Sequence, residues 1–165
     1  MPSARVGTPA SSQRITFVPD LLILPGKARA GVLPAATVDG QLKVPEHVDH
    51  VGWWDGSARA GEPFGSTVIA GHVDSATEGK GFFVRLLGVK KGDVVTLRAG
   101  EHQLRYRITS VRTVARQALA TDSRAFDQAG PHRLVLITCT GAYRRDRGGY
   151  ERNLVVTGQP IGRAS

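Results

Sequence analysis

The sequence predicts a mainly all-β fold, a closed or nearly closed β-barrel, and three observations lead to it. Short runs of aliphatic and β-branched residues recur along the whole chain. Turn-forming pairs such as Pro25-Gly26 and Asp39-Gly40 separate these runs, and the chain holds 20 glycines and 9 prolines. Almost no stretch has apolar residues at helical spacing. Many short strands with little helix are typical of a barrel, which removes the exposed edges of a sheet by closing it.

The strands follow from the apolar runs, taken in chain order. We predict them at residues 21–24, 32–38, 42–44, 66–71, 93–98, 103–111, 134–139 and 153–158. The Asp39-Gly40 pair between the second and third strand predicts a hairpin. In 103–111, Leu104, Tyr106 and Ile108 alternate with polar residues, which predicts a half-buried strand. Phe82, Phe83, Leu86 and Leu87 have helical spacing and predict a short helix at 81–89; residues 47–54 are expected to form one helical turn.

The length of 165 residues corresponds to one domain, which can bury a core without disulfides or a metal. Residues 1–14 are rich in Ser, Ala, Pro and Gly and are expected to be a flexible tail, so residues 15–165 form the folded domain. This N-terminus lacks the apolar core of a signal peptide. No run of about 18 apolar residues could span a membrane. The sequence leaves open whether the protein is cytosolic or a soluble domain separated from its membrane anchor.

The single cysteine, Cys139, is the first candidate for chemistry. Residues 134–138 before it are aliphatic or β-branched and predict a buried strand that ends at Cys139. Catalytic groups are often found where a rigid strand gives way to a loop. One cysteine excludes an intramolecular disulfide and any zinc site with several cysteines. The position of Cys139 alone is also consistent with a structural role as a small buried hydrophobic residue.

Two further residues could assist a thiol nucleophile. His72 directly follows the buried run 66–71, and in a barrel the ends of two such strands can lie at the same rim. An imidazolium stabilises a nearby thiolate. Arg152 directly precedes the last predicted strand and offers fixed donors to a developing oxyanion. Each also fits a structural role at a strand end, and the remaining histidines, His47, His50, His102 and His132, are expected to be structural.

The net charge of +8 points to an anionic partner such as a cell wall, a membrane surface or nucleic acid. The basic residues are scattered, except for Arg144, Arg145 and Arg147, which we interpret as part of a solvated loop. Nucleic-acid binding would favour aromatic residues among basic ones on one face of a sheet. Only Tyr106 lies between two arginines, and it points to the opposite face from both.

Three motifs in order carry a family resemblance. They are GHVDS at 71–75, LITC at 136–139 and an arginine that enters the final strand, and together they resemble the sortases, the cysteine transpeptidases of Gram-positive cell surfaces. Within the family, the sequence looks most like the actinobacterial class F group. The similar segments are VIAGHVDS, GFFVRL, LITCTGAY and Y-x-x-N-L-V-V-T. The similarity extends from about Leu21 to Ile161.

The resemblance implies a fold, a reaction and a set of residues. The fold would be the sortase barrel of about eight strands, mostly antiparallel, with short helices and 3₁₀ turns. Cys139 would attack an LPXTG-type sorting signal between Thr and Gly and form a thioacyl enzyme. His72 would protonate the leaving amine and then deprotonate the incoming one. Arg152 would hold the substrate and the oxyanion, and Thr138 would help to orient substrate.

The resemblance also implies partners and a location. The partners would be secreted proteins with such signals and the amine of a peptidoglycan precursor, without cofactor, metal or nucleic acid. The enzyme would be a monomer at the outer face of the membrane, held by an N-terminal anchor missing from this chain. The main alternative is a basic β-barrel that binds cell wall or nucleic acid without catalysis. An L,D-transpeptidase is disfavoured, because LVLITCTG lacks the S-x-G-C-like motif of those enzymes.

Overall fold

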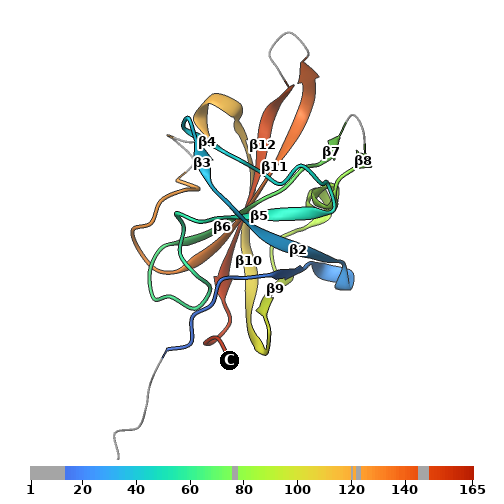
Figure 1. Cartoon of the computed structure of the whole chain (residues 1–165). Helices are drawn as coiled ribbons and strands as arrows, with labels where there is room; N and C mark the ends of the chain where they lie inside the picture. Colours follow the sequence, from blue (N-terminus) through green and yellow to red (C-terminus); the bar gives the residue numbers. More distant parts are fainter. Residues whose placement is uncertain (1–13, 76–77, 120, 122–123, 145–148) are drawn as a thin grey trace, which may run out of the picture.

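The computed structural model describes residues 14–75, 78–119, 121, 124–144 and 149–165. Eight strands close into a barrel in the order β1-β2-β5-β6-β11-β12-β10-β9, which confirms the predicted fold class (Figure 1). The barrel strands are β1 (Leu21–Ile23), β2 (Arg29–Ala35), β5 (His50–Trp54), β6 (Ser66–Ala70), β9 (Val94–Ala99), β10 (His102–Ala115), β11 (Arg133–Arg144) and β12 (Gly149–Pro160). The predicted tail at 1–14 lies outside the described residues except for Arg14.

Two small hairpins and three 3₁₀ helices complete the part of the chain that the structure describes. The hairpins are β3 (Thr37–Val38) with β4 (Gln41–Leu42), and β7 (Asp74–Ser75) with β8 (Gly79–Lys80). The first of them turns at Asp39-Gly40, as the sequence predicts. The 3₁₀ helices are η1 (Pro25–Lys27), η2 (Phe82–Gly88) and η3 (Arg116–Ala118). In the part of the chain that the structure describes, no helix has the length and hydropathy needed to span a membrane.

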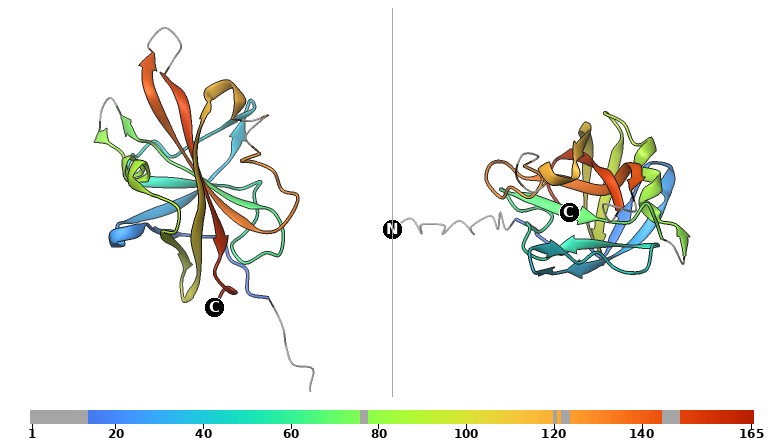
Figure 2. Two further views of the ribbon diagram at one scale, coloured as in Figure 1. Left: turned by 180° about the vertical axis from the view of Figure 1, so that it is seen from behind. Right: turned by 90° about the horizontal axis from the view of Figure 1, so that it is seen from above.

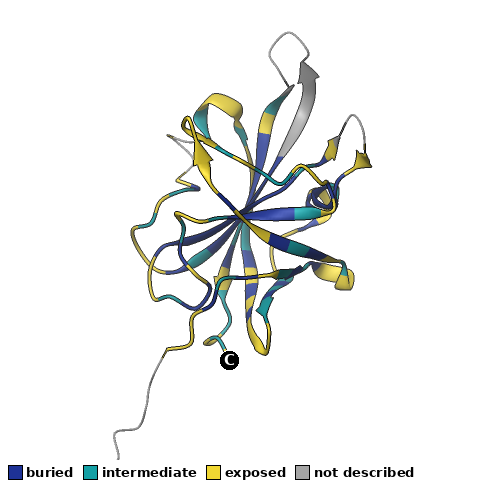
Figure 3. Cartoon of the chain, viewed as in Figure 1, coloured by how far each residue is buried: buried dark blue, intermediate teal, exposed yellow. Residues whose placement is uncertain are grey.

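The burial of each strand explains its sequence pattern (Figure 3). All residues of β6 are buried, because one face contacts the barrel interior through Ile69 while Val68 and Ala70 pack into a second apolar cluster outside it. A strand covered on both faces is expected to be continuously apolar. In the first half of β10, by contrast, Tyr106 is buried inside the barrel and Arg107 is exposed.

Three sequence predictions are wrong, for one common reason. Residues 47–54 do not form a helical turn, because residues 50–54 are strand β5, held between β2 and β6. Cys139 does not end its strand, since β11 continues to Arg144. Arg152 lies within β12 and not before it. In each case pairing with a neighbouring strand of the sheet makes a strand of residues that local pattern alone assigns to a turn or a loop.

Strands β11 and β12, of 12 residues each, form a hairpin that projects from the barrel. Strands β11 and β12 pair from Leu134 opposite Gly158 out to Arg144 opposite Gly149. Seen from behind, this hairpin rises at one end of the molecule and the C-terminus lies at the other (Figure 2). The barrel therefore has two distinct ends, one with the hairpin and one with the C-terminus.

A buried polar pair lies in the core near the C-terminal end. The hydroxyl of Tyr106 is 2.8 Å from Nε2 of His132, and both side chains are buried. Burial raises the pKa of the Tyr106 hydroxyl, which therefore stays protonated and can donate. Burial also lowers the pKa of the His132 imidazole, which favours its neutral form.

We therefore predict that stability falls as the pH drops below the ordinary histidine pKa, about 6.5. In that range the unfolded chain binds a proton at residue 132 that the folded protein resists, so the free energy of unfolding decreases with decreasing pH. Urea unfolding between pH 7.5 and 5.5 measures this slope. A His132→Gln variant should lose part of it, whereas the exposed His102→Gln control should keep it. An unchanged slope in His132→Gln would contradict this assignment.

Candidate active site

Three neighbouring strands bring the predicted site residues to one end of the barrel. Strands β6 and β11 run parallel, with Ala70 opposite Ile137. His72 and Cys139 each follow two residues later, so the backbone carries both away from the same end of adjacent strands. On the other side of β11, Cys139 pairs with Asn153 and the next residue, Thr140, pairs with Arg152. This is the end from which the β11–β12 hairpin projects (Figure 1).

The backbone around His72 is held tightly by η2. The amide of Phe83 donates to the carbonyl of His72 at 3.2 Å. Gly81 passes so close that a Cβ there would lie 2.2 Å from the His72 carbonyl oxygen. A Cβ at Gly71 would likewise lie 2.7 Å from the ring of Phe83. Both glycines are therefore needed for the packing that fixes His72 at the end of β6.

The imidazole of His72 has a defined partner. Its Nε2 lies 3.0 Å from the backbone carbonyl oxygen of Pro45, and the side chain is half-buried. A carbonyl oxygen only accepts, so Nε2 carries a hydrogen in this contact. In the neutral ring the lone pair then belongs to Nδ1, which is the nitrogen that can take a proton.

Thr138, the residue before Cys139, joins the two strand ends. Its side chain is 2% exposed, and its hydroxyl donates to the carbonyl of Gly71 at 2.8 Å. The amide of Gly71 donates in turn to the carbonyl of Ile137 at 3.1 Å. This reciprocal pair sets the spacing between the His72 and Cys139 backbones. The hydroxyl is used inside the protein, and contact of Thr138 with a substrate stays a prediction.

Arg152 is exposed and lines a cavity of about 660 Å³ beside β12. Ala115, Arg116, Gln117, Tyr150 and Glu151 line the same cavity. Of the neighbouring arginines, Arg144 lies at the far end of β11, four residues beyond Thr140, and Arg145 and Arg147 lie outside the described residues. At about 3.3 Å per residue, four residues correspond to roughly 13 Å of strand. The backbone register therefore favours Arg152 over Arg144 as the arginine next to Cys139.

Sequence reasoning missed one contact that joins the two flanks of the site. The hydroxyl of Tyr150 donates to Oδ2 of Asp74 at 2.7 Å. Asp74 follows His72 by two residues, and Tyr150 precedes Arg152 by two residues. The bond therefore ties the segment that carries His72 to the strand that carries Arg152. The two residues are 76 positions apart, and no local pattern indicates such a pairing.

Histidines and carboxylates also gather near the loop that contacts His72. The His47 Nδ1 lies 3.1 Å from Oε1 of Glu78, and this hydrogen bond raises the pKa of His47. His50 similarly lies 3.0 Å from the carboxylate of Asp49. Among the described residues, no group of three or more histidine, cysteine or acidic side chains could hold a metal ion.

The comparisons with known proteins agree with this fold. A family model described as "Sortase domain" matches residues 26–161. Sortase A from Listeria monocytogenes superposes with a TM-score of 0.65 at 18% identity, over 90% of this chain and 89% of that one. Sortase C-1 from Actinomyces oris gives 0.64 at 23% identity, over 86% and 71%. A lid mutant of sortase A from Corynebacterium diphtheriae gives 0.66 at 21%, over 93% and 74%. A search of curated proteins finds no match.

Proposed function

The chain belongs to the sortase family, and on that premise we propose that it is a cysteine transpeptidase for LPXTG-type sorting signals. Cys139 attacks the carbonyl carbon of the signal's threonine, and the Thr–Gly bond breaks to leave a thioacyl enzyme. An amine of a peptidoglycan precursor then attacks the thioester and releases the joined product. The observation that carries this proposal is the placement of His72, Cys139 and Arg152 at one end of three adjacent strands.

The arrangement of His72 supports its role in proton transfer. Because Nε2 is engaged by the carbonyl of Pro45, Nδ1 is the nitrogen that takes the proton of the Cys139 thiol and gives it to the leaving glycine amine. The same nitrogen later accepts a proton from the incoming amine, so the two half-reactions restore the enzyme. The fixed backbone at Gly71 and Gly81 holds the ring in place for both steps.

The amino-acid sequence of the motifs supports an assignment to one class within the family. We propose that the enzyme is closest to the class F sortases of Gram-positive actinobacteria. We further propose that it acts as a monomer at the outer face of the cell membrane. Its partners would be secreted proteins that carry the sorting signal.

A fluorogenic LPXTG peptide tests the reaction, with triglycine as the added amine. We expect cleavage between Thr and Gly and, with the amine present, a new product that joins the two peptides. A peptide of the same composition in scrambled order is the control and should remain intact. No turnover across a panel of sorting peptides would contradict the proposed substrate class and favour a binding module without catalysis.

Replacing Arg152 with alanine should lower kcat/KM by about 100-fold, which is the usual loss when one oxyanion donor is removed. Two variants are matched controls. Arg144→Ala tests the register of β11 with β12, and Arg116→Ala removes a charge from the cavity that Arg152 lines. Both should stay within about threefold of the wild type, as expected for charges away from the reacting atoms. An equal loss in either control would move the role away from Arg152.

Replacing Tyr150 with phenylalanine should lower kcat several-fold at nearly constant KM, because the Tyr150–Asp74 bond positions His72 relative to Arg152. Asp74→Ala should have a similar effect. The double variant should lose no more than either single variant, since both break the same hydrogen bond. Additive losses, or a fall in melting temperature that accounts for the lost activity, would contradict a positioning role.

A further inference from the structure

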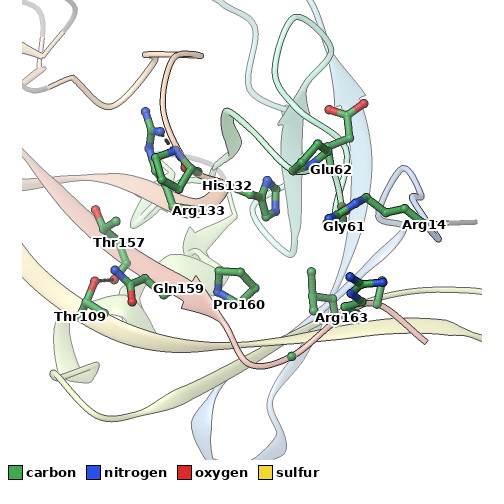
Figure 4. Close-up of a pocket in the computed structure, with 15 residues that line it drawn as sticks. Arg14, Gly61, Glu62, Thr109, His132, Arg133, Thr157, Gln159, Pro160 and Arg163 are labelled. Carbon is green, nitrogen blue, oxygen red and sulfur yellow. Dashed lines mark hydrogen bonds between the residues drawn. The ribbon is translucent and has the colours of Figure 1, made fainter. Parts of the chain in front are cut away.

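Two adjoining depressions cross the outside of the barrel away from the Cys139 end. The first, of about 540 Å³, lies near the C-terminus and is shown in Figure 4. The second, of about 390 Å³, lies beside it, and both are lined by Arg133 and Thr157. The two depressions therefore adjoin at these residues, and we call them together the arginine groove. None of the residues proposed for catalysis lines it.

The lining of the arginine groove is strongly cationic. Its arginines come from the chain ends, the strands and a loop; they are Arg14, Arg112, Arg124, Arg133 and Arg163. Among the described residues that line the groove, two are acidic, Glu62 in the first depression and Asp127 in the second. The carboxylate of Asp127 accepts the amide of Ala129 at 2.9 Å. The groove thus carries an excess of positive charge on a concave surface, which concentrates its field.

The charge at the junction of the two depressions is fixed in place by neutral groups. The guanidinium of Arg133 donates to the backbone carbonyls of Asp127, Ala129 and Pro131 at 2.6–3.0 Å. Among the described residues, no carboxylate forms an ion pair with Arg14, Arg133 or Arg163. In Figure 4, Arg133 and Thr157 lie on one side of the first depression, with Arg14 and Arg163 on the other. These three arginines therefore offer charge that no carboxylate of the described residues pairs with.

Further polar groups line the first depression. Thr109, Thr157 and Gln159 contribute polar side chains along one wall. These groups are hydrogen-bonding partners that suit an anionic oxygen-rich ligand.

The chemistry of the lining selects among anionic polymers. Arginine forks match the oxygens of phosphate, and two depressions in series suit charges that repeat along a chain. Among the described residues, no phenylalanine, tyrosine or tryptophan lines either depression, so the lining lacks the stacking platform that is typical of single-stranded nucleic-acid sites. We propose that the arginine groove binds a flexible polymer of phosphate-linked units without aromatic bases.

Linear inorganic polyphosphate is the probe, and binding is measured by calorimetry at several salt concentrations. We expect log K to fall linearly with log salt, as counterions are released. Arg14→Gln/Arg163→Gln and Arg112→Gln/Arg124→Gln each remove two charges from one depression. Each should weaken binding at least about tenfold at low salt and reduce the salt slope by about 2. The control Arg29→Gln/Lys91→Gln removes two exposed charges outside the groove and should bind like the wild type. Cleavage of the sorting peptide should be unchanged in all three variants.

Several outcomes would overturn the proposal. An equal loss in the control would show a general charge effect in place of a site. Orthophosphate that binds as tightly as the polymer would reduce the groove to a single-anion site. Polyglutamate or single-stranded DNA of matched charge binding as tightly would remove the preference for phosphate-linked, base-free chains. Preferential binding to anionic vesicles, lost in Phe64→Ser, would indicate a membrane surface, since Phe64 is 67% exposed and pairs with Pro131 at the groove.

Discussion

Replacing Cys139 with alanine should abolish cleavage of the sorting peptide, with a loss of at least about 1,000-fold in kcat. The chain has one cysteine, so no other thiol can substitute as nucleophile. Alanine also removes the only atom able to hold the acyl group as a thioester. In the sheet, the backbone of residue 139 in β11 pairs with that of Asn153 in β12. A small alanine is expected to leave this pairing intact.

Intact-mass spectrometry makes this prediction specific. Wild-type enzyme with peptide and no amine should gain the mass of the acyl fragment, and hydroxylamine should remove it. Because the cysteine is single, the position of the adduct is unambiguous. Ser110→Ala, which deletes one oxygen on β10 away from the site, is the matched control and should keep the adduct. Turnover by Cys139→Ala within tenfold of the wild type would refute covalent catalysis at this residue.

Replacing His72 with alanine should lower kcat by about 1,000-fold, within the range typical of a lost general acid and base. The leaving amine would then have no proton donor, and the incoming amine would have no base. Added imidazole should restore part of the activity, since it fits the space of the lost ring and supplies the same chemistry.

The control for His72 is the neighbouring His47→Ala. His47 is exposed, and its hydrogen bond to Glu78 raises its own pKa, but nothing places it at the end of β6. We expect its variant to stay within about twofold of the wild type, as for most surface substitutions. An equal loss of activity in His47→Ala and His72→Ala would contradict the assignment of His72 as the acid and base. Failure of imidazole to restore any activity to His72→Ala would contradict it as well.

The spacing of apolar residues was sufficient to predict most of the barrel. The continuous run at β6 and the alternation at β10 each report how many faces of a strand are covered, and both are local properties of the chain. The candidate residues His72 and Cys139 could also be found, because each stands next to such a run. Their roles in catalysis stay predictions until the variants are measured.

What the sequence could not predict depends on partners distant in the chain. The His50–Trp54 segment is a strand because β2 and β6 supply its hydrogen bonds, and β11 continues past Cys139 because β12 pairs with it. The Tyr150–Asp74 bond joins residues 76 positions apart. A single pair such as Tyr150 and Asp74 produces no periodic pattern in the sequence, since its two members lie in unrelated local patterns.

By itself, then, the sequence determined the fold class, the family motifs and the order of His72, Cys139 and Arg152. Only the tertiary structure decided that Arg152 stands opposite the residue after Cys139, that Pro45 engages Nε2 of His72, and that five arginines line one groove. The physical reason is the closure of the barrel. Local periodicity sets which face of each strand is buried, whereas the register between strands sets which side chains meet.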